Sequence, residues 1–119
     1  MFGKGIYFAD IVSKSANYCK PKDQNEGLLL ICEVALGQMQ TKLVADFNAH
    51  NLPQGYHSTH GIGKFAPSSG EHLADVYIPN GAISPTGIES ASLLYNEYVV
   101  YNREQVLCRY IVHVRFHFK

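Results

Sequence analysis

The segment MFGKGIYFADIVSKSANYC, residues 1–19, combines a glycine-rich turn, a short apolar run and a polar helical stretch. Gly3 and Gly5 predict a tight turn or a close approach of the backbone to a ligand, because glycine has no side chain. Residues 6–8 are apolar and aromatic, which is typical of a short strand. Asp10 is a residue type that caps helices, so we expect a helix from there to about the end of the segment.

The predicted helix presents three side chains that suit a flat, polar ligand. Ser15 and Tyr18 are three residues apart, and Lys14 and Tyr18 are four apart, so they share one helix face. An aromatic ring stacks on a planar group, and a hydroxyl can hydrogen-bond to it. The same spacing is also typical of an ordinary amphipathic helix in which Tyr18 packs on the core, and spacing alone leaves both interpretations open.

Composition and charge indicate one soluble, globular domain over residues 1–119. Hydrophobic residues make up 46% of the chain and charged residues 17%, which is enough apolar surface for a core. The formal net charge is zero, so nothing predicts strong binding of this chain to DNA or RNA. No apolar run reaches the roughly 18 residues of a membrane span, and the first residues do not resemble a secretory signal, so we expect none. The cysteines are interpreted as reduced thiols of an intracellular protein, not as a disulfide framework or a zinc site: Cys19, Cys32 and Cys108.

The middle of the chain changes character after one strongly apolar run. LLLICEVAL, residues 28–36, is bounded by Gly27 and Gly37 and predicts a central strand. Residues 41–92 then hold most of the glycine and proline, and about twenty residues around LPQGYHSTHGIGKFAPSSGEH predict a functional or mobile loop. DVYIP, residues 75–79, predicts a short strand within this region.

The last third of the chain is rich in aromatic and β-branched residues. SLLYNEYVVY, residues 92–101, and VLCRYIVHVRFHF, residues 106–118, predict two strands, which we expect to pair with each other in antiparallel fashion. In the second strand, alternation predicts a buried face of Cys108, Tyr110, Val112, Val114, Phe116 and Phe118, and a partly solvated face of Leu107, Arg109, Ile111, His113, Arg115 and His117.

Glu97 is the residue in this region that the strand pattern does not explain. It shares a predicted face with Tyr95 and Val99, and burying a carboxylate there is costly unless it is paired or lines a cleft. One interpretation is a surface residue on an exposed strand. The other is a catalytic carboxylate held rigidly at the middle of a strand. Glu33 lies similarly within LICEV, so the pattern is only moderately specific.

The histidines do not predict a metal site. His57 and His60 are three residues apart, but they lie in the expected loop, and no cysteine or pair of acids accompanies them. His113 and His117 fall on the wetter face of the last predicted strand. We therefore expect no bound metal.

Taken in order, four stretches resemble one enzyme family: FGKGIYFADIVSKSANYC, EVALG, HSTHGIGK and LLYNEYVVYN. They resemble the catalytic domains of poly(ADP-ribose) polymerases, which are NAD+-dependent ADP-ribosyltransferases of the diphtheria-toxin-like class. The HSTHGIGKFAPSS segment is most similar to the nuclear branch that responds to DNA damage. The resemblance implies an α+β fold of split, mixed and antiparallel β-sheets with short helices around an NAD+ cleft.

The resemblance also implies roles for individual residues. Glu97 matches the catalytic glutamate, and Lys14 matches a lysine that lines the site beside it. On the cofactor side, the matching residues are Tyr7 and Tyr18 as the two walls of the nicotinamide pocket, Ser15 as the hydroxyl that binds the carboxamide, and Gly5 as a close backbone approach. Met1 and Tyr95 match positions on the acceptor side, where a growing chain docks. No metal is implied.

One part of the family pattern has no counterpart in residues 1–119. The family places a His-Gly pair upstream of the glycine-aromatic run, whereas His60-Gly61, the His-Gly pair of this sequence, lies downstream of it. We do not transfer the role to His60. We expect the chain to be the C-terminal portion of a catalytic domain that lacks its N-terminal strands, with a bare strand edge prone to aggregation and weak or no NAD+ binding by itself.

The leading hypothesis is poly-ADP-ribosylation: ADP-ribose moves from NAD+ to protein acceptors or to ADP-ribose chains, and nicotinamide is released. Glutamate at position 97 favours polymer formation over the alternative of mono-ADP-ribosylation. A third interpretation is an inactive fragment or an interaction module. The family implies a nuclear location and contact with DNA only through domains outside this chain, and no membrane partner is expected.

Overall fold

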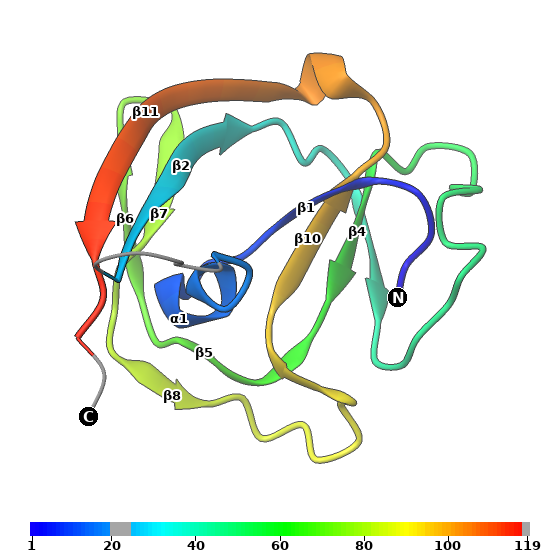
Figure 1. Ribbon diagram of the computed structural model, residues 1–119. Coiled ribbons are helices and arrows are strands. Elements are labelled where there is room, and N and C mark those ends of the chain that lie inside the picture. The colour runs from blue at the N-terminus through cyan, green and yellow to red at the C-terminus, as the bar shows by residue number, and fades with distance from the viewer. Residues whose placement is uncertain (20–24, 118–119) are drawn as a thin grey trace.

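The computed structural model describes residues 1–19 and 25–117 as several small sheets around one short helix, α1 (Figure 1). The elements are β1 (Ile6–Phe8), α1 (Val12–Ala16), β2 (Glu26–Val34), β3 (Met39–Lys42), β4 (Ser58–Gly61), β5 (Gly63–Pro67), β6 (Gly70–Leu73), β7 (Val76–Pro79), β8 (Ile83–Pro85), β9 (Leu93–Tyr95), β10 (Glu97–Val100), a 3-10 turn (Arg103–Gln105) and β11 (Val106–Arg115).

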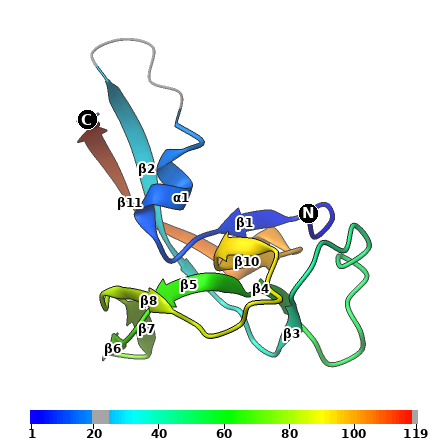
Figure 2. The same cartoon turned by 90° about the horizontal axis from the view of Figure 1, so that it is seen from below.

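The central sheet has the strand order β1-β10-β4-β3, with β3 parallel to β4 and the other pairs antiparallel. A second sheet, β8-β5-β9, continues from it, because β9 leads directly into β10. β6 and β7 form a hairpin, and β2 and β11 form a long two-stranded ribbon. Figure 2 shows this ribbon projecting away from the central sheet, with α1 beside it.

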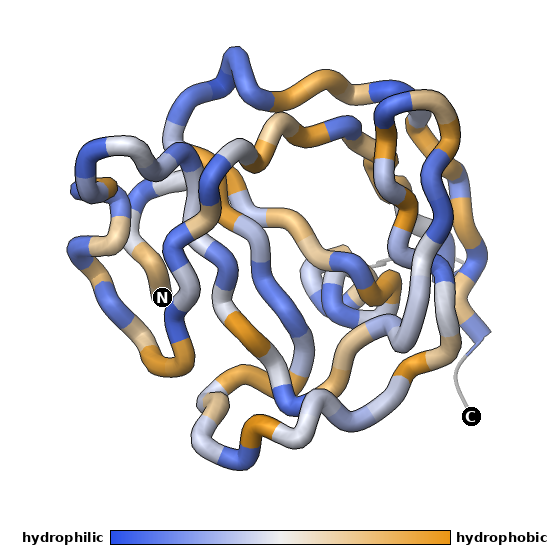
Figure 3. Tube along the Cα trace, turned by 180° about the vertical axis from the view of Figure 1, so that it is seen from behind, coloured by the Kyte–Doolittle hydropathy of each residue, from blue (hydrophilic) through white to orange (hydrophobic). Residues whose placement is uncertain are grey.

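The core lies on the central sheet and is small. Phe2, Ala49 and Val99 form its buried cluster, and Met1, Tyr7, Leu93 and Tyr101 pack around it half-buried. Hydrophobic residues recur along the whole trace rather than gathering in one segment (Figure 3). Many of them, including Leu28, Leu30, Tyr110 and Ile111 of the ribbon, are exposed.

The two buried hydroxyl groups of β4, on Ser58 and Thr59, are hydrogen-bonded. The Ser58 hydroxyl donates to the Leu36 carbonyl at 2.7 Å. The Thr59 hydroxyl oxygen accepts from Gln40 Nε2 and from the Tyr101 hydroxyl, each at 2.8 Å. Because a buried polar group without a partner costs free energy, these bonds explain how serine and threonine occupy fully buried positions next to β10.

The predicted strand over residues 92–101 is interrupted, and its predicted pairing is wrong. Asn96 separates β9 from β10, and its carboxamide oxygen accepts the backbone N–H of Gly63 at 2.9 Å. β10 pairs with β1 and β4, whereas β11 pairs with β2. The two C-terminal strands therefore lie in different sheets, because each one finds its partner far away in the sequence.

The expectation of a central strand at residues 28–36 is also wrong within the described residues. β2 runs from Glu26 to Val34 and pairs with β11 alone. Leu28 and Leu30 remain more than half exposed. An apolar run predicts a strand, but it does not specify what covers its faces.

The expected loop of about twenty residues contains three strands, β4, β5 and β6. Glycine there serves close packing rather than flexibility: a Cβ on Gly61 would lie 2.5 Å from the ring of Phe2. Tertiary packing has overridden the low strand propensity of glycine and proline. The short strand predicted at residues 75–79 is confirmed as β7, Val76–Pro79.

Two further local predictions are corrected. α1 covers only Val12–Ala16, and Ile11 stands at its N-cap without a side-chain hydrogen bond, so Asp10 does not cap it. In β11 the register shifts between Cys108 and Tyr110, which breaks the predicted alternation, and Tyr110 is 66% exposed. Val112 and Val114 are half-buried as expected, while Phe118 lies outside the described residues.

Candidate active site

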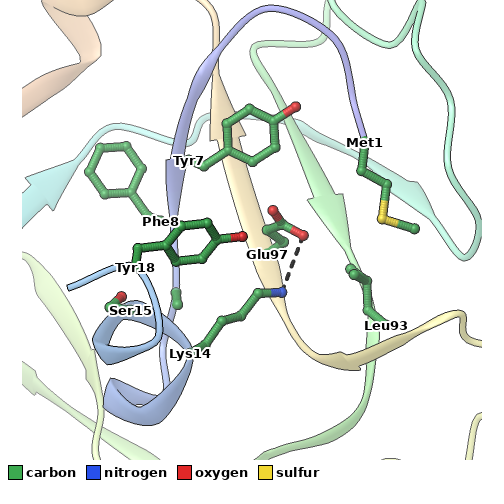
Figure 4. Close-up of a pocket in the computed structure, with 9 residues that line it drawn as sticks. Met1, Tyr7, Phe8, Lys14, Ser15, Tyr18, Leu93 and Glu97 are labelled. Atoms are coloured by element: carbon green, nitrogen blue, oxygen red, sulfur yellow. Dashed lines mark hydrogen bonds and ion pairs between the residues drawn. The ribbon is translucent and has the colours of Figure 1, made fainter. Parts of the chain in front are cut away.

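A cavity of about 680 Å³ opens where β1, α1 and the start of β10 meet (Figure 4). Its volume lies within the roughly 300–1,000 Å³ typical of small-molecule sites. The lining residues come from four separate parts of the chain: Met1, Tyr7, Phe8, Ala9, Lys14, Ser15, Tyr18, Leu93 and Glu97. The structure thus brings together six of the eight site residues expected from the sequence.

Glu97 is the first residue of β10 and is only 8% exposed. Its Oε2 lies 3.2 Å from Lys14 Nζ, and the same ammonium donates to the Tyr95 carbonyl at 3.0 Å. Figure 4 shows the Lys14 side chain extending from α1 toward this carboxylate. The buried carboxylate therefore has a cationic partner, as a buried charge requires, and one edge of it still lines the cavity.

Tyr7 is fixed by two hydrogen bonds of its hydroxyl. The oxygen accepts the backbone N–H of Phe2 at 3.0 Å and donates to the Gly3 carbonyl at 2.6 Å. Gly3 has φ of 82°, a left-handed conformation that glycine adopts without strain. The turn before β1 thus folds back on the Tyr7 hydroxyl and holds the ring at the cavity wall.

Tyr18 is held much more loosely than Tyr7. It lies just after α1, where its backbone N–H donates to the Ser15 carbonyl at 3.0 Å. Its side chain is 77% exposed, so it does not pack on the core in the way that an ordinary amphipathic helix would require. Its ring is available to a ligand in the cavity, and Ser15 lines the same wall.

Two expected site residues do not line the cavity. A Cβ on Gly5 would lie 2.5 Å from Val99 Cγ1, so Gly5 permits β1 to pack against β10. Tyr95 contributes its backbone carbonyl to Lys14, and it is paired with Phe65 in the β5–β9 ladder. Their predicted ligand-side and acceptor-side roles remain predictions.

A buried polar cluster behind Glu97 was missed by the sequence analysis. Asp10 Oδ2 accepts from Asn96 Nδ2 at 2.9 Å and from the Tyr98 hydroxyl at 3.0 Å. The His60 ring stacks on Tyr98 with centroids 4.6 Å apart. Burial, reinforced by the negative charge of Asp10, raises the pKa of Tyr98, and burial lowers the pKa of His60. Strand alternation could have indicated this cluster, because it places Asn96 and Tyr98 on the face of the strand opposite Glu97.

Within residues 1–19 and 25–117, no group of three or more His, Cys, Asp or Glu side chains gathers in a way that could hold a metal ion. The same part of the chain contains no helix long and apolar enough to cross a membrane.

A family profile, described as the poly(ADP-ribose) polymerase catalytic domain, matches residues 1–116. The chain belongs to this family. Members of the family are NAD+ ADP-ribosyltransferases, and the mixed α+β architecture of small sheets agrees with that fold, so the expected fold class is confirmed. The family resemblance read from the sequence is confirmed as well.

Several curated relatives align over nearly the whole chain. Poly [ADP-ribose] polymerase 2 of Arabidopsis thaliana is 52% identical over 123 residues, which are 100% of this chain and 19% of the relative. Poly [ADP-ribose] polymerase 2 of Homo sapiens is 53% identical over 99% of the chain and 21% of the relative. Poly [ADP-ribose] polymerase 1 of Xenopus laevis is 48% identical over 100% of this chain and 12% of the relative. The chain thus spans about a fifth of the length of the first of these relatives.

Proposed function

We propose that residues 1–119 form part of a catalytic domain that transfers ADP-ribose from NAD+ to protein acceptors and to ADP-ribose chains. The observation that carries the proposal is the Glu97–Lys14 pair, with a separation of 3.2 Å, at the wall of a cavity that Tyr7, Ser15 and Tyr18 also line. The match of the family profile over residues 1–116 supports the same reaction class.

The nicotinamide end of NAD+ fits the α1 side of this cavity. Tyr7, held by its hydroxyl, offers a fixed aromatic wall, and the exposed ring of Tyr18 closes over the ligand as the second wall. The Ser15 hydroxyl is placed to hydrogen-bond the carboxamide. Stacking and one hydrogen bond orient the leaving ring before the bond breaks, which lowers the entropic part of the barrier.

The transfer step breaks the carbon–nitrogen bond between ribose and nicotinamide, and the bonding electrons leave with nicotinamide. Positive charge develops on the ribose, and the Glu97 carboxylate stabilises it electrostatically and orients the ribose hydroxyls. An acceptor oxygen forms the new carbon–oxygen bond and gives its proton to Glu97 acting as a general base. Lys14 holds that carboxylate through the 3.2 Å contact.

Met1 and Leu93 line the cavity on the side of Glu97 away from α1. We assign this side, with Tyr95 close by in sequence, to the acceptor. A second ADP-ribose unit bound there would present its hydroxyl to Glu97, which is the requirement for chain growth. We propose a nuclear location, and contact with DNA through other parts of the whole protein, because the family resemblance implies both and this chain has no excess of positive charge.

The test is transfer of labelled ADP-ribose. The protein that contains this chain is incubated with labelled NAD+, and polymer and free nicotinamide are measured with and without benzamide, which carries the same carboxamide on a six-membered ring. The proposal predicts labelled polymer, nicotinamide in matching amount, and inhibition of both by benzamide. A single ADP-ribose on each acceptor would favour mono-ADP-ribosylation, and no transfer would favour the non-catalytic alternative.

A further inference from the structure

Cys32 and Cys108 face each other across the β2–β11 ribbon. They are direct partners in the antiparallel register, and both are free thiols, with Cys108 exposed. Directly opposed residues of antiparallel strands have Cα atoms about 4.5–5.5 Å apart, which falls within the roughly 4.4–6.8 Å that a disulfide spans. The backbone is therefore already in a geometry that a disulfide accepts.

The two thiols also influence each other. Burial raises the pKa of Cys32, and the neighbouring Cys108 side chain raises it further. The register shift directly after Cys108 is a bulge, and a bulge increases the local twist. Cys19 lies elsewhere, with its Sγ 3.4 Å from the Leu28 carbonyl, so it provides a matched control.

We propose that Cys32 and Cys108 are an oxidation site that forms a reversible disulfide when a peroxide is supplied. One thiolate attacks hydrogen peroxide, the O–O bond breaks, and a sulfenic acid and one water result. The other thiol attacks the sulfenic sulfur, the S–S bond forms, and a second water leaves. Two thiols and one peroxide thus yield one disulfide and two waters, with both sulfur atoms oxidised and the peroxide reduced.

The disulfide would have a mechanical consequence for the ribbon. It would join β2 to β11 and close the chain between positions 32 and 108, and closing a long loop restricts the unfolded state most. A raised thiol pKa leaves less thiolate at neutral pH. Formation of the disulfide should therefore be slow at neutral pH and accelerate as the pH rises toward 9.

The experiment treats the protein that contains this chain with hydrogen peroxide at about pH 8, then determines by mass spectrometry which of the three thiols, Cys19, Cys32 and Cys108, stay free and which peptides are linked. The expected result is loss of two of three thiols and of two hydrogens in mass, a single 32–108 peptide link, a higher Tm, and reversal by dithiothreitol. Cys19→Ser should behave identically, and Cys108→Ser should form no intramolecular link. A link that includes Cys19, or peroxide-treated protein with three free thiols, would overturn the proposal.

A second inference concerns the polar cluster behind Glu97, and it rests on the proposed function. Asn96 and Tyr98 flank Glu97 and both donate to Asp10, which precedes α1 by two residues. From the cavity side, Lys14 of α1 contacts Glu97 and the Tyr95 carbonyl. The segment 10–14 therefore holds residues 95–98 from both faces of the strand.

Asn96 and Tyr98 each have a further contact besides their bond to Asp10. Asn96 is 6% exposed and also accepts the Gly63 N–H, so its carboxamide is oriented at both ends. Tyr98 remains a proton donor to Asp10, since its pKa is raised by burial. His60 covers the Tyr98 ring by stacking nearly parallel to it, with planes 10° apart.

We infer that Asp10 is a positioning residue for the transfer reaction, and that it sets the distance between Glu97 and the nicotinamide wall formed by Ser15 and Tyr18. Removing the Asp10 carboxylate should leave Glu97 and the Ser15–Tyr18 wall of the cavity intact but displaced from each other. A displacement of about 1 Å in a catalytic group can lower a rate by about a hundredfold, whereas binding of a small ring to one wall should change little.

The test compares Asp10→Ala, Asp10→Asn and Tyr98→Phe with Tyr110→Phe, an exposed tyrosine of β11, as control. Asp10→Ala should lower kcat for transfer by about ten- to a hundredfold while benzamide binding stays within about twofold. Asp10→Asn, which keeps an acceptor oxygen, should recover part of the rate, and Tyr110→Phe should match wild type.

Full activity of Asp10→Ala would overturn the positioning role, and so would equal losses of rate and benzamide binding, because those indicate general unfolding. Failure of the proposed function is distinguishable from both. In that case the wild-type protein and the Tyr110→Phe control would themselves show no transfer.

Discussion

Glu97 shows how one residue acquires a chemical role from its surroundings. The Lys14 ammonium at 3.2 Å gives this nearly buried side chain the oppositely charged partner that a buried charge requires. The same lysine bonds the Tyr95 carbonyl, so it fixes the carboxylate relative to the turn between β9 and β10. Glu33, the other mid-strand glutamate, instead pairs with Arg109 at the surface and lines no part of the cavity.

Tyr18 allows ligand binding to be tested without disturbing the fold. Because the side chain is 77% exposed, Tyr18→Ala should leave the Tm essentially unchanged. It should weaken benzamide binding by about tenfold, which corresponds to the stacking energy of one aromatic ring. Titration calorimetry measures this, with Tyr18→Phe as the matched variant that keeps the ring. Equal affinity of Tyr18→Ala and wild type would exclude a stacking role.

His60 makes stability depend on pH. Burial lowers its folded pKa below 6.5, so between that lowered value and 6.5 the unfolded chain binds more protons than the folded one. The contribution of His60 to the free energy of unfolding is therefore fully present above about pH 6.5, and it is lost as the pH decreases through this window. Urea unfolding at pH 7.5 and 5.5 should show a loss in wild type and a smaller loss in His60→Gln. Identical pH dependence in both proteins would contradict the assignment.

At the scale of elements, the site depends on the break between β9 and β10. β9 pairs in parallel with β5, and β10 pairs with β1 and β4, so the chain changes sheets at Asn96. Gly63 makes the crossing possible by approaching the backbone of Tyr95 closely. Glu97 follows immediately, so the change of sheet is what places its carboxylate at the cavity wall.

Gly63→Ala tests this arrangement. Its Cβ would lie 2.5 Å from Tyr95 Cα, and backbone on both sides cannot move without breaking the Asn96 bond. We expect a loss of about 1–3 kcal/mol in unfolding free energy, measured by urea denaturation. Gly55→Asn is the control, because Gly55 has open space around it and asparagine tolerates its φ of 86°. A Gly63→Ala protein as stable as this control would refute the close-approach argument.

The elements also show what the sequence can predict and what it cannot. Local patterns identified Ile6–Phe8, Val76–Pro79 and the existence of strands near both ends of the chain. Strand partners were not predictable, because pairing is decided by contacts across the molecule: β10 contacts β1 some ninety residues away. The role of Asp10 was not predictable either. The sequence indicated a helix cap, whereas its hydrogen-bond partners, Asn96 and Tyr98, are distant in sequence.

The site itself was more predictable than the topology. Glu97 stood out because a carboxylate interrupts an apolar strand face, and residues 14, 15 and 18 stood out by their spacing on the predicted helix, although α1 ends before Tyr18. Their convergence on one cavity, together with Tyr7 and Met1, required the structure. Phe8, Ala9 and Leu93 line the same cavity but carry no polar group, so no chemical pattern in the sequence distinguishes them from core residues.

On the scale of the whole molecule, the described core is small relative to the apolar surface. The exposed large side chains include Leu28, Leu30 and Ile31 on β2 and Leu107, Tyr110 and Ile111 on β11. Exposed apolar side chains on both faces of the ribbon favour association. The 119 residues produced by themselves should bind a hydrophobic dye and self-associate in sedimentation experiments. A monomer without dye binding would contradict this reading of the ribbon.

We propose that Glu97 performs the transfer, while the α1 side of the cavity binds nicotinamide. The most direct measurement compares Glu97→Gln with Glu33→Gln in the protein that contains this chain, recording polymer formation from labelled NAD+ and benzamide affinity on the same samples. We expect Glu97→Gln to lose about 10²–10⁴-fold in polymer formation with benzamide affinity unchanged, and Glu33→Gln to match wild type. Polymer formed by Glu97→Gln at the wild-type rate would contradict this proposal.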